Sequence, residues 1–379
     1  MTFIGSNLRT ARLFHGLSQP ELGERIGCSK QFLSRIESGV DIPTPALVTR
    51  LCDTLAVLPE FFEEADPMPI ADEQCHFRKQ LTTKPVFHQI ARARGEFLKR
   101  MVNVMEEHLE LPRYDFEEGD MSSAEAIEQA AERAREHWGL GLGPIRNMTR
   151  IAENAGAVVM PVSSLAAEID AISFATRRPV IAMNVASRSA CRLRFGIAHE
   201  IGHFCLHTGV QTGDKLTESQ ANRFASAFLM PRRFFAAECR AALRGTRLSW
   251  PALADIKRRW GVSKAAILYR GRQLGVFSEE QYRSGVISLT RRGEARAEDE
   301  DKDMPVEVPD LLSDSIQVLR EVFGISRPVL ARKMRVQTSV LDNLLAARFE
   351  TVPFPVAPDN VLPLKVGRSA ERRSGRSAS

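Results

Sequence analysis

Apolar residues recur at helical spacing through most of the chain, so the sequence predicts a mostly helical protein. Between residues 221 and 229 the apolar positions follow the spacing i, i+3, i+4, i+7 and i+8, which places them on one face of a helix. A longer stretch with near-helical spacing covers about 86–111 and ends at Pro112, because proline does not continue a helix. We expect this stretch to connect two domains and to offer a possible homodimer contact.

Short runs of β-forming residues interrupt the helical pattern in the middle of the chain, at residues 157–161, 169–175 and 179–183. A helical pattern precedes these runs, and another follows them near residue 195. The order helix, strands, helix is typical of a small α+β domain. The predicted fold class is therefore α+β and mostly helical, with an all-α domain at the N-terminal end and helical units at the C-terminal end.

Residues 17–39 carry the pattern of two short helices joined by a tight turn. The first helix is expected at residues 19–26, and Gly27 permits the left-handed backbone that a tight turn needs. Ser29 can cap the second helix, which Gly39 ends. Six leucine and isoleucine side chains would form the core of this unit: Leu22, Ile26, Leu33, Ile36, Leu47 and Leu51.

Composition sets the broad class of the protein. A chain of 379 residues with 44% hydrophobic and 26% charged residues has room for two or three ordinary globular domains. No apolar run reaches the length of a membrane-spanning helix, and the first residues lack the pattern of a signal peptide. Six scattered cysteines without a CxxC pair argue against a disulfide framework and against a cysteine zinc site. We expect a reduced, cytoplasmic protein.

The net charge of +5 says little about the folded part of the chain. Most of it lies in a serine-, glycine- and arginine-rich tail at residues 365–379, which is expected to be disordered. Residues 293–310 are strongly acidic instead, and we expect them to form a linker.

The strongest chemical signal is the HExxH pattern His199-Glu200-Ile201-Gly202-His203. On a helix this spacing places the two imidazoles one turn apart on the same face, where both can bind one Zn²⁺. Glu200 points about 100° around the helix, where it can accept a proton instead of binding the metal. The alternative is a pair of histidines buried in a core helix.

Glu218 is the candidate third ligand. Thr217 is expected to cap the next helix with Gln220 as its capping-box partner, and Glu218 then begins the buried face. A carboxylate that points inward needs a partner, and a zinc ion held by the two histidines would be that partner. In the alternative, Glu218 only favours the helix N-terminus electrostatically. His207 is a rival ligand or a neighbour of the ligands, because it follows His203 by one turn.

The residues around HExxH resemble the ImmA/IrrE metallopeptidase family over roughly residues 122–290. The resemblance rests on Arg194-Phe195-Gly196-Ile197-Ala198-His199-Glu200-Ile201-Gly202-His203, Leu206-His207, Glu218-x-x-Ala221-Asn222-x-Phe224-Ala225 and Leu229-Met230-Pro231. It implies a zincin-like domain that acts as a site-specific endopeptidase on a helix-turn-helix repressor, in a stress or mobile-element response. It also implies that His199, His203 and Glu218 bind Zn²⁺ and that Glu200 is the general base.

Residues 17–39 resemble the Xre-type, lambda-repressor-like helix-turn-helix over about 55 residues. The second helix would present Lys30, Gln31, Ser34 and Arg35 outward, and these residue types read base edges in the major groove. Gln19 and Lys30 are also placed to approach phosphates. The alternative is a helical bundle that has lost its DNA contacts, which the six basic and nine acidic residues of 1–66 favour.

Two further segments repeat the helix-turn-helix pattern, at residues 259–267 and 325–341. We expect them to support the metal site and to dock proteins rather than to contact DNA. The expected domains are 1–66, an Xre-type helix-turn-helix domain; 67–121, a helical connector; 122–245, a zincin-like domain; 246–292, a helix-turn-helix-like unit; 293–310, an acidic linker; 311–347, a helical C-terminal unit; and 348–379, a disordered basic tail.

The sequence as a whole predicts a DNA-binding transcriptional regulator with a zinc-dependent endopeptidase domain. Its expected partners are an operator in double-stranded DNA and a protein substrate, with a repressor as the favoured class, and no membrane. The segment 180–183 could pair with substrate backbone as an added strand. Two alternatives stay open: a transcription factor whose zincin fold only senses a ligand, and an antitoxin or immunity-type partner that binds DNA.

Overall fold

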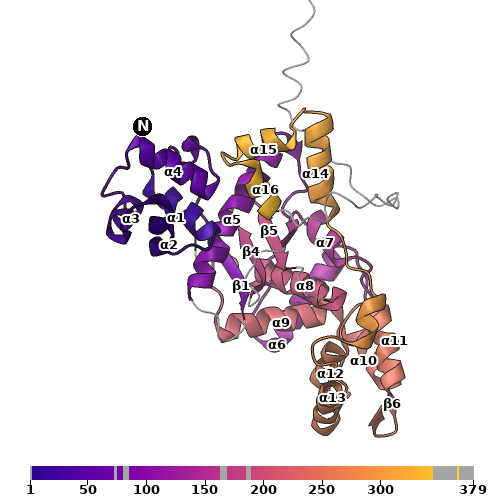
Figure 1. Cartoon of the computed structure of the whole chain (residues 1–379). Helices are drawn as coiled ribbons and strands as arrows, with labels where there is room; N and C mark the ends of the chain where they lie inside the picture. The colour runs from indigo at the N-terminus through magenta and orange to yellow at the C-terminus, as the bar shows by residue number, and fades with distance from the viewer. Residues whose placement is uncertain are drawn as a thin grey trace, which may run out of the picture. The chain divides into compact units, whose positions relative to one another are not determined.

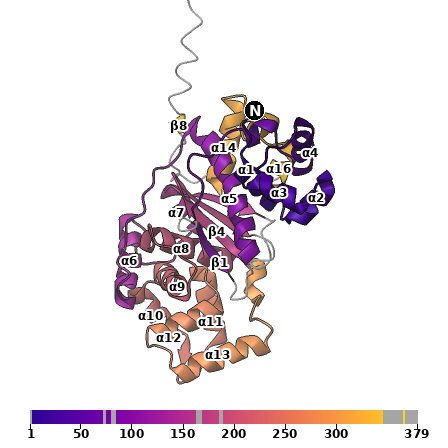
Figure 2. The same cartoon turned by 90° about the vertical axis from the view of Figure 1, so that its left-hand side faces the viewer.

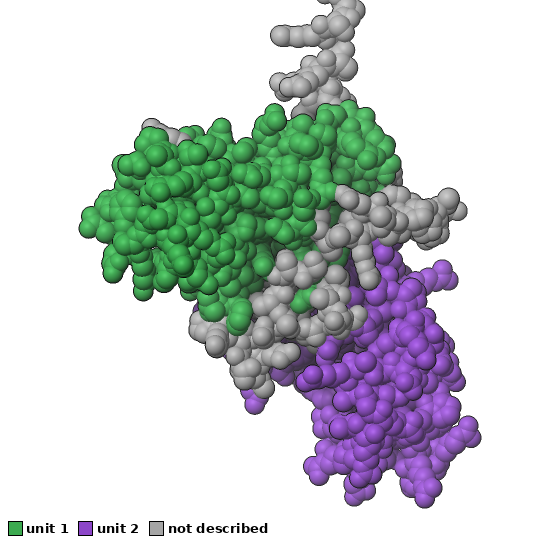
Figure 3. All heavy atoms as spheres, in the orientation of Figure 1, with its two compact units in different colours: residues 1–112, 160–184, 310–379 green, residues 113–159, 185–309 purple. Residues whose placement is uncertain are grey.

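The structure is a computed structural model that describes residues 2–71, 75–79, 85–162, 169–184, 189–344 and 365–366. The chain forms two compact units, coloured separately in Figure 3. Unit 1 comprises residues 1–112, 160–184 and 310–379, and unit 2 comprises residues 113–159 and 185–309. The predicted fold class, α+β and mostly helical, is confirmed. The limits drawn for the individual domains stay predictions.

The N-terminal helices of unit 1 form the expected small helical bundle (Figure 1). They are α1 (Gly5–Phe14), α2 (Gln19–Ile26), α3 (Lys30–Glu37), α4 (Pro45–Leu55) and the 3-10 helix η1 (Pro59–Phe62). Gly27 ends α2 in the left-handed conformation with φ of 69°, and the Ser29 hydroxyl caps α3 by accepting from the backbone N–H of Phe32. The six expected core side chains are buried.

A long helix, α5 (Pro85–Glu106), packs in the interior of unit 1. The ring of Phe97 stacks on Phe14 at 4.1 Å and on Phe61 at 5.3 Å between centroids. The same helix contacts strand β4 and the three C-terminal helices. The apolar positions of this helix are largely buried within the same unit. The homodimer contact expected for this stretch stays a prediction.

The C-terminal helices of unit 1 are α14 (Asp310–Glu321), α15 (Arg327–Lys333) and α16 (Thr338–Leu344), which lie beside α5 in Figures 1 and 2. The turn between α15 and α16 pairs with the N-terminal bundle through a β-bridge from Val336 to Val57. The N–H of Leu58 donates to the Arg335 carbonyl at 2.9 Å, and the N–H of Gln337 donates to the Ala56 carbonyl at 2.8 Å. The third helix-turn-helix-like turn is therefore used for packing.

A four-stranded sheet follows the order β1-β4-β5-β3. Its strands are β1 (Cys75–Lys79), β3 (Val158–Val162), β4 (Ile169–Ala175) and β5 (Pro179–Asn184). β4 pairs antiparallel with both β1 and β5. The three expected runs are confirmed as strands, whereas β1 was not predicted. The expected tail at 348–379 lies outside the described residues except for β8 (Lys365–Val366), which pairs with β2 (Leu109–Glu110).

Unit 2 is helical apart from part of β3 and a short hairpin of β6 (Leu243–Arg244) and β7 (Arg247–Leu248). Its helices are α6 (Ala124–His137), α7 (Met148–Asn154), α8 (Ala190–Leu206), α9 (Lys215–Leu229), α10 (Arg232–Ala241), α11 (Trp250–Trp260), α12 (Lys264–Gln273) and α13 (Glu279–Arg291). α8 packs against α9, and α6 packs on the other side of α9. Within the described ranges, none of the helices combines the length and apolar character that crossing a bilayer requires.

The turn between α11 and α12 has the geometry of the turn between α2 and α3. Gly261 adopts φ of 65°, and the Ser263 hydroxyl accepts from the backbone N–H of Ala266. The two motifs differ, however, in how far the lysine after the turn is exposed to solvent. Lys264 occupies the position that corresponds to Lys30, yet its side chain is only 3% exposed. The second motif thus repeats the local structure of the first without its open surface.

The acidic segment 293–310, which was expected to be a linker, covers the turn between α11 and α12. It carries the 3-10 helix η3 (Asp299–Asp303). Lys257 Nζ lies 2.6 Å from Glu298 and 2.5 Å from Asp301. The Glu298 carboxylate also accepts from the backbone N–H of Lys264 at 3.0 Å, at the start of α12.

Lys264 is bound by the same segment. Its Nζ lies 2.5 Å from Glu294 and 3.0 Å from Glu300. Burial alone would lower the pKa of Lys264, but the hydrogen bonds that its ammonium donates to Glu294 and Glu300 outweigh burial and raise it. The lysine therefore stays charged, and residues 294–301 are held in place by buried ion pairs.

We expect Lys264→Met to lower the free energy of unfolding of unit 2 by about 3–5 kcal/mol, because it leaves Glu294 without its buried cation and leaves Glu300 only the longer contact of 3.7 Å with Lys257. Urea unfolding followed by tryptophan fluorescence measures this selectively, since Trp138, Trp250 and Trp260 all belong to unit 2 and are the three tryptophans of the chain. Arg283→Met is the control, because Arg283 is 73% exposed. An unchanged midpoint for Lys264→Met would show that the segment only rests on the surface.

Candidate metal centre and DNA-binding face

Two neighbouring helices of unit 2 bring together the residues expected to bind metal. His199 and His203 lie one turn apart on α8, and both side chains are fully buried. Glu218 lies in the first turn of α9, and its side chain is 20% exposed. Among the described residues, His199, His203 and Glu218 form the one group of histidine, cysteine and acidic side chains that could hold a metal ion.

The distances within this group have the size of a zinc site. The Nε2 atoms of His199 and His203 lie 3.1 Å apart, and each lies 3.4 Å from a carboxylate oxygen of Glu218. Ligand atoms about 2.0–2.1 Å from a tetrahedral zinc ion are separated by about 3.3–3.4 Å. The three side chains therefore fit a single ion between them, with histidine nitrogen and carboxylate oxygen as its ligands.

The protonation states also suit metal binding. Burial lowers the pKa of His203 to about 4, so its imidazole is neutral near pH 7. Burial alone would raise the pKa of Glu218, but interactions with His199 and His203 outweigh it and hold that pKa well below its usual range. A neutral imidazole and an ionised carboxylate are the forms that coordinate metals.

The close approach of α8 and α9 depends on Gly202, within the HExxH pattern. A Cβ atom at this position would lie 3.1 Å from the ring of Phe224 and 3.3 Å from the Ala221 carbonyl oxygen on α9. Both separations are tighter than ordinary van der Waals contact, so a side chain at residue 202 would require Phe224 or the backbone of α9 to shift by a few tenths of an ångström. Glycine at this position lets α9 bring Glu218 to the histidines.

The start of α9 differs from our expectation. Thr217 was predicted as the N-cap, but the cap is Asp214, whose carboxylate accepts from the backbone N–H groups of Leu216 at 2.6 Å and Thr217 at 3.0 Å. An ionised carboxylate that satisfies two helix-end donors is a stronger cap than one hydroxyl. Glu218 keeps its place in the first turn.

Two side chains of α9 that contact the histidines were not predicted to take part in the metal site. Asn222 Oδ1 lies 3.1 Å from His199 Nδ1, and Gln220 Oε1 lies 3.0 Å from His207 Nε2. His207 in turn approaches His203 through their Nδ1 atoms, which are 3.0 Å apart. His207 therefore lies behind His203, on the side away from Glu218, and not in the group formed by His199, His203 and Glu218. The sequence holds one indication that Gln220 and Asn222 lie near the metal site: they follow Glu218 by two and four residues on the same helix.

Glu200 is fully buried on α8, between the two histidines in sequence. Cys205 is also buried, and burial raises the pKa of its thiol to about 12, which agrees with its expected place in the core. The segment 180–183 does not offer the expected edge for a substrate strand. It belongs to β5, which lies between β4 and β3 and therefore has a neighbour on each side.

The recognition helix of the N-terminal bundle exposes most of the side chains expected to contact DNA. Lys30, Gln31 and Ser34 are exposed on α3. Arg35 is also exposed, but Asp41 holds its guanidinium with two contacts of 2.8 Å. A DNA contact by Arg35 would therefore have to compete with this ion pair.

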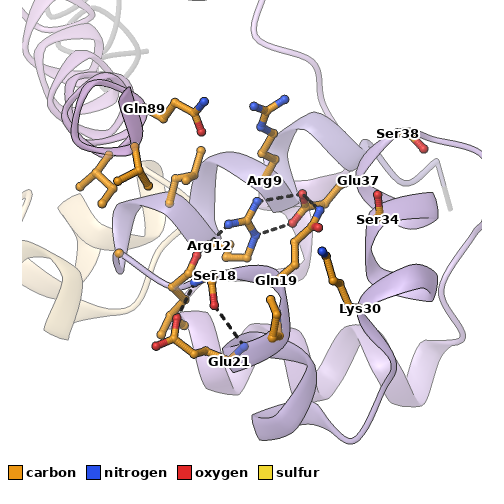
Figure 4. Close-up of a pocket in the computed structure, with 16 residues that line it drawn as sticks. Arg9, Arg12, Ser18, Gln19, Glu21, Lys30, Ser34, Glu37, Ser38 and Gln89 are labelled. Carbon is orange, nitrogen blue, oxygen red and sulfur yellow. Dashed lines mark hydrogen bonds and ion pairs between the residues drawn. The ribbon is translucent and has the colours of Figure 1, made fainter. Parts of the chain in front are cut away.

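Gln19, at the start of α2, is held by a buried ion pair (Figure 4). Glu37 accepts from Arg12 Nε at 2.6 Å and from Arg12 Nη2 at 2.9 Å, and Gln19 Nε2 donates to the same carboxylate at 2.9 Å. These bonds fix the start of α2 relative to α3.

A hollow of about 610 Å³ lies in front of this ion pair. Arg9, Lys30 and Ser34 line it from the helical bundle, while Val86 and Gln89 of α5 line its other side (Figure 4). The position of α5 near α3 was not predicted, because nothing in the pattern of α5 relates it to residues about sixty positions earlier.

Comparison with known families agrees with both candidate sites, the metal centre and the DNA-binding face. Residues 4–64 match a family described as a helix-turn-helix domain. Residues 152–271 match a peptidase family described as the IrrE N-terminal-like domain. The chain joins a helix-turn-helix domain to an IrrE-like domain. The resemblance predicted from the sequence is thereby confirmed, and the IrrE-like match includes the three grouped residues on α8 and α9. No curated protein matches the chain.

Proposed function

We propose that this protein is a DNA-binding transcriptional regulator whose IrrE-like domain is a zinc-dependent endopeptidase. The observation that carries the proposal is the grouping of His199, His203 and Glu218 at zinc-like separations, on a helix that also carries Glu200. The proposed substrate class is a helix-turn-helix repressor, as the resemblance to ImmA/IrrE peptidases implies. The match to a peptidase family supports the reaction class.

The proposed mechanism divides the work between the ligands and Glu200. A zinc ion bound by His199, His203 and Glu218 would supply Lewis-acid chemistry, polarising a peptide carbonyl and making water acidic. Glu200 accepts the proton of the attacking water and delivers it to the leaving nitrogen of the peptide bond. A carboxylate suits this role because the same group can act first as general base and then, once protonated, as general acid.

Glu200 distinguishes this proposal from a non-proteolytic sensor. A fold that only senses a ligand needs the three ligand residues but not a carboxylate between the histidines. Glu200 is fully buried on α8, between the two histidines in sequence, which supports the role of general base in the HExxH pattern.

The proposed DNA contact uses the exposed face of α3. Lys30 and Gln31 would approach bases or phosphates near the start of the helix, and Ser34 lies one turn later. Arg35 would take part if DNA displaces it from Asp41, and Gln19, held by Glu37, would approach a phosphate.

We expect the protein to bind about one zinc ion per chain and His203→Ala to abolish binding, because two remaining ligands hold the ion too weakly. Metal content after dialysis, measured by mass spectrometry, tests this. His137→Ala is the control, since His137 pairs with Asp115 and Glu117 elsewhere in unit 2. Full zinc content in His203→Ala would overturn the ligand assignment.

We expect Glu200→Gln to keep zinc and fold but to lower the cleavage rate by roughly 10²–10⁴-fold, because the amide keeps the shape and removes the base. The assay incubates the zinc-loaded protein with purified helix-turn-helix repressors, chosen first from the neighbouring genes, and follows the fragments on a gel. Glu280→Gln, an exposed position on α13, is the control. Cleavage by Glu200→Gln at the wild-type rate would contradict the assigned role.

We expect Lys30→Ala with Arg35→Ala to weaken binding to the protein's own promoter without unfolding the bundle, because both side chains are exposed. A lost base contact is worth about 1–3 kcal/mol, and a lost phosphate contact also reduces the salt dependence. Gel-shift titrations at two salt concentrations measure both effects. Arg258→Ala, on the covered second motif, should leave affinity unchanged. Unchanged affinity in the Lys30 and Arg35 variant together with weaker binding by Arg258→Ala would assign the DNA contact to the second motif instead.

A further inference from the structure

A chain of four hydrogen-bonding groups runs from the backbone to the metal site. Gln220 Nε2 donates to the Met121 carbonyl at 3.2 Å, and Gln220 Oε1 lies 3.0 Å from His207 Nε2. His207 Nδ1 lies 3.0 Å from His203 Nδ1. The other nitrogen of His203, Nε2, faces His199 and Glu218. His207 is 1% exposed, so water has little access to this chain.

The Met121 carbonyl sets the direction of every bond in the chain, because a carbonyl oxygen can only accept. The amide of Gln220 must turn its NH₂ group to Met121, which leaves its oxygen to accept from His207 Nε2–H. A neutral imidazole carries one N–H, so His207 Nδ1 is then an acceptor. His203 must therefore donate from Nδ1–H.

The proton on Nδ1 decides the state of Nε2, the atom of His203 that would bind the metal. With its single proton on Nδ1, His203 presents the Nε2 lone pair to the point between His199 and Glu218. In the opposite tautomer an N–H bond would occupy that point, and metal binding would first require the proton to move. The hydrogen bond on the far nitrogen of a histidine is what selects its tautomer and orientation as a ligand.

We propose that His207 and Gln220 are positioning residues of the metal centre, which hold His203 in the Nδ1–H tautomer before any metal binds. The zinc part of this inference rests on the proposed function, whereas the tautomer part does not. His207 ends α8, and Gln220 lies on α9 between Glu218 and Asn222. The same two helices thus supply both the ligands and the groups that orient them.

The first test reads the tautomer directly in the full-length, metal-free protein. Histidine labelled with ¹⁵N gives distinct signals for protonated and unprotonated ring nitrogens, and His203→Ala identifies the signals of His203 among the eight histidines. We expect a protonated Nδ1 and an unprotonated Nε2 for His203. In Gln220→Leu and His207→Leu this preference should weaken. A His203 protonated on Nε2 in the wild type would overturn the inference.

The second test measures zinc affinity by competition with a chelator. His207→Leu removes the acceptor for His203 Nδ1–H, and we expect a 10–100-fold weaker affinity, the usual effect of losing such a group. The aspartate of His207→Asp has the branched four-atom side chain of leucine but keeps an acceptor beside His203, so it should recover most of the affinity that His207→Leu loses. Tryptophan fluorescence unfolding checks that both variants keep unit 2 folded.

The outcomes separate this inference from the proposed function. Wild-type affinity in a folded His207→Leu would overturn the positioning role while leaving the zinc site intact. A wild-type protein that binds no zinc would overturn the proposed function, and the tautomer of His203 in the metal-free protein would still decide the inference. Equal losses in His207→Leu and His207→Asp would also overturn it, because a purely structural role does not distinguish an acceptor from an alkyl group.

Discussion

The contact between α8 and α9 is the constraint on which the candidate metal centre depends. It brings together side chains fifteen or more residues apart in sequence, and Gly202 leaves room there for Phe224 and the backbone of α9. Two imidazoles and a carboxylate removed from water would each be costly in isolation. Held together, the two histidines keep the pKa of the Glu218 carboxyl low, and burial keeps the imidazole of His203 neutral. The chemistry of the site thus depends on how α8 and α9 pack against each other.

The sequence predicts those features of fold and site that depend on local spacing. HExxH on a helix, Glu218 near the start of the next helix and the left-handed turn at Gly27 all follow from periodicity and capping rules. Features that depend on distant partners were not accessible. Thr217 and Asp214 both fit a capping pattern, and only the fold decides between them. The acidic segment resembles a linker by composition, because nothing local indicates that Lys257 and Lys264 lie beneath it.

The three helix-turn-helix-like motifs show how one local pattern serves different ends. In the first, Gly27 and Ser29 set the turn and Lys30 is exposed. In the second, the turn has the same geometry, but carboxylates cover the corresponding lysine. In the third, the turn pairs with the N-terminal bundle through Val336. Local sequence therefore specifies the shape of the motif, and the surrounding chain decides whether its surface is open to a partner.

The discontinuity of unit 1 has a consequence for synthesis on the ribosome. Helix α5 ends at residue 106, but α14–α16, which pack against it, begin only at residue 310. At about 5–20 residues per second, translation of the intervening two hundred residues takes roughly 10–40 s. During that time part of the apolar surface of α5 lacks its native cover. The nascent chain is thus exposed to aggregation and to chaperones until its last helices emerge, and a C-terminal truncation would make that temporary exposure permanent.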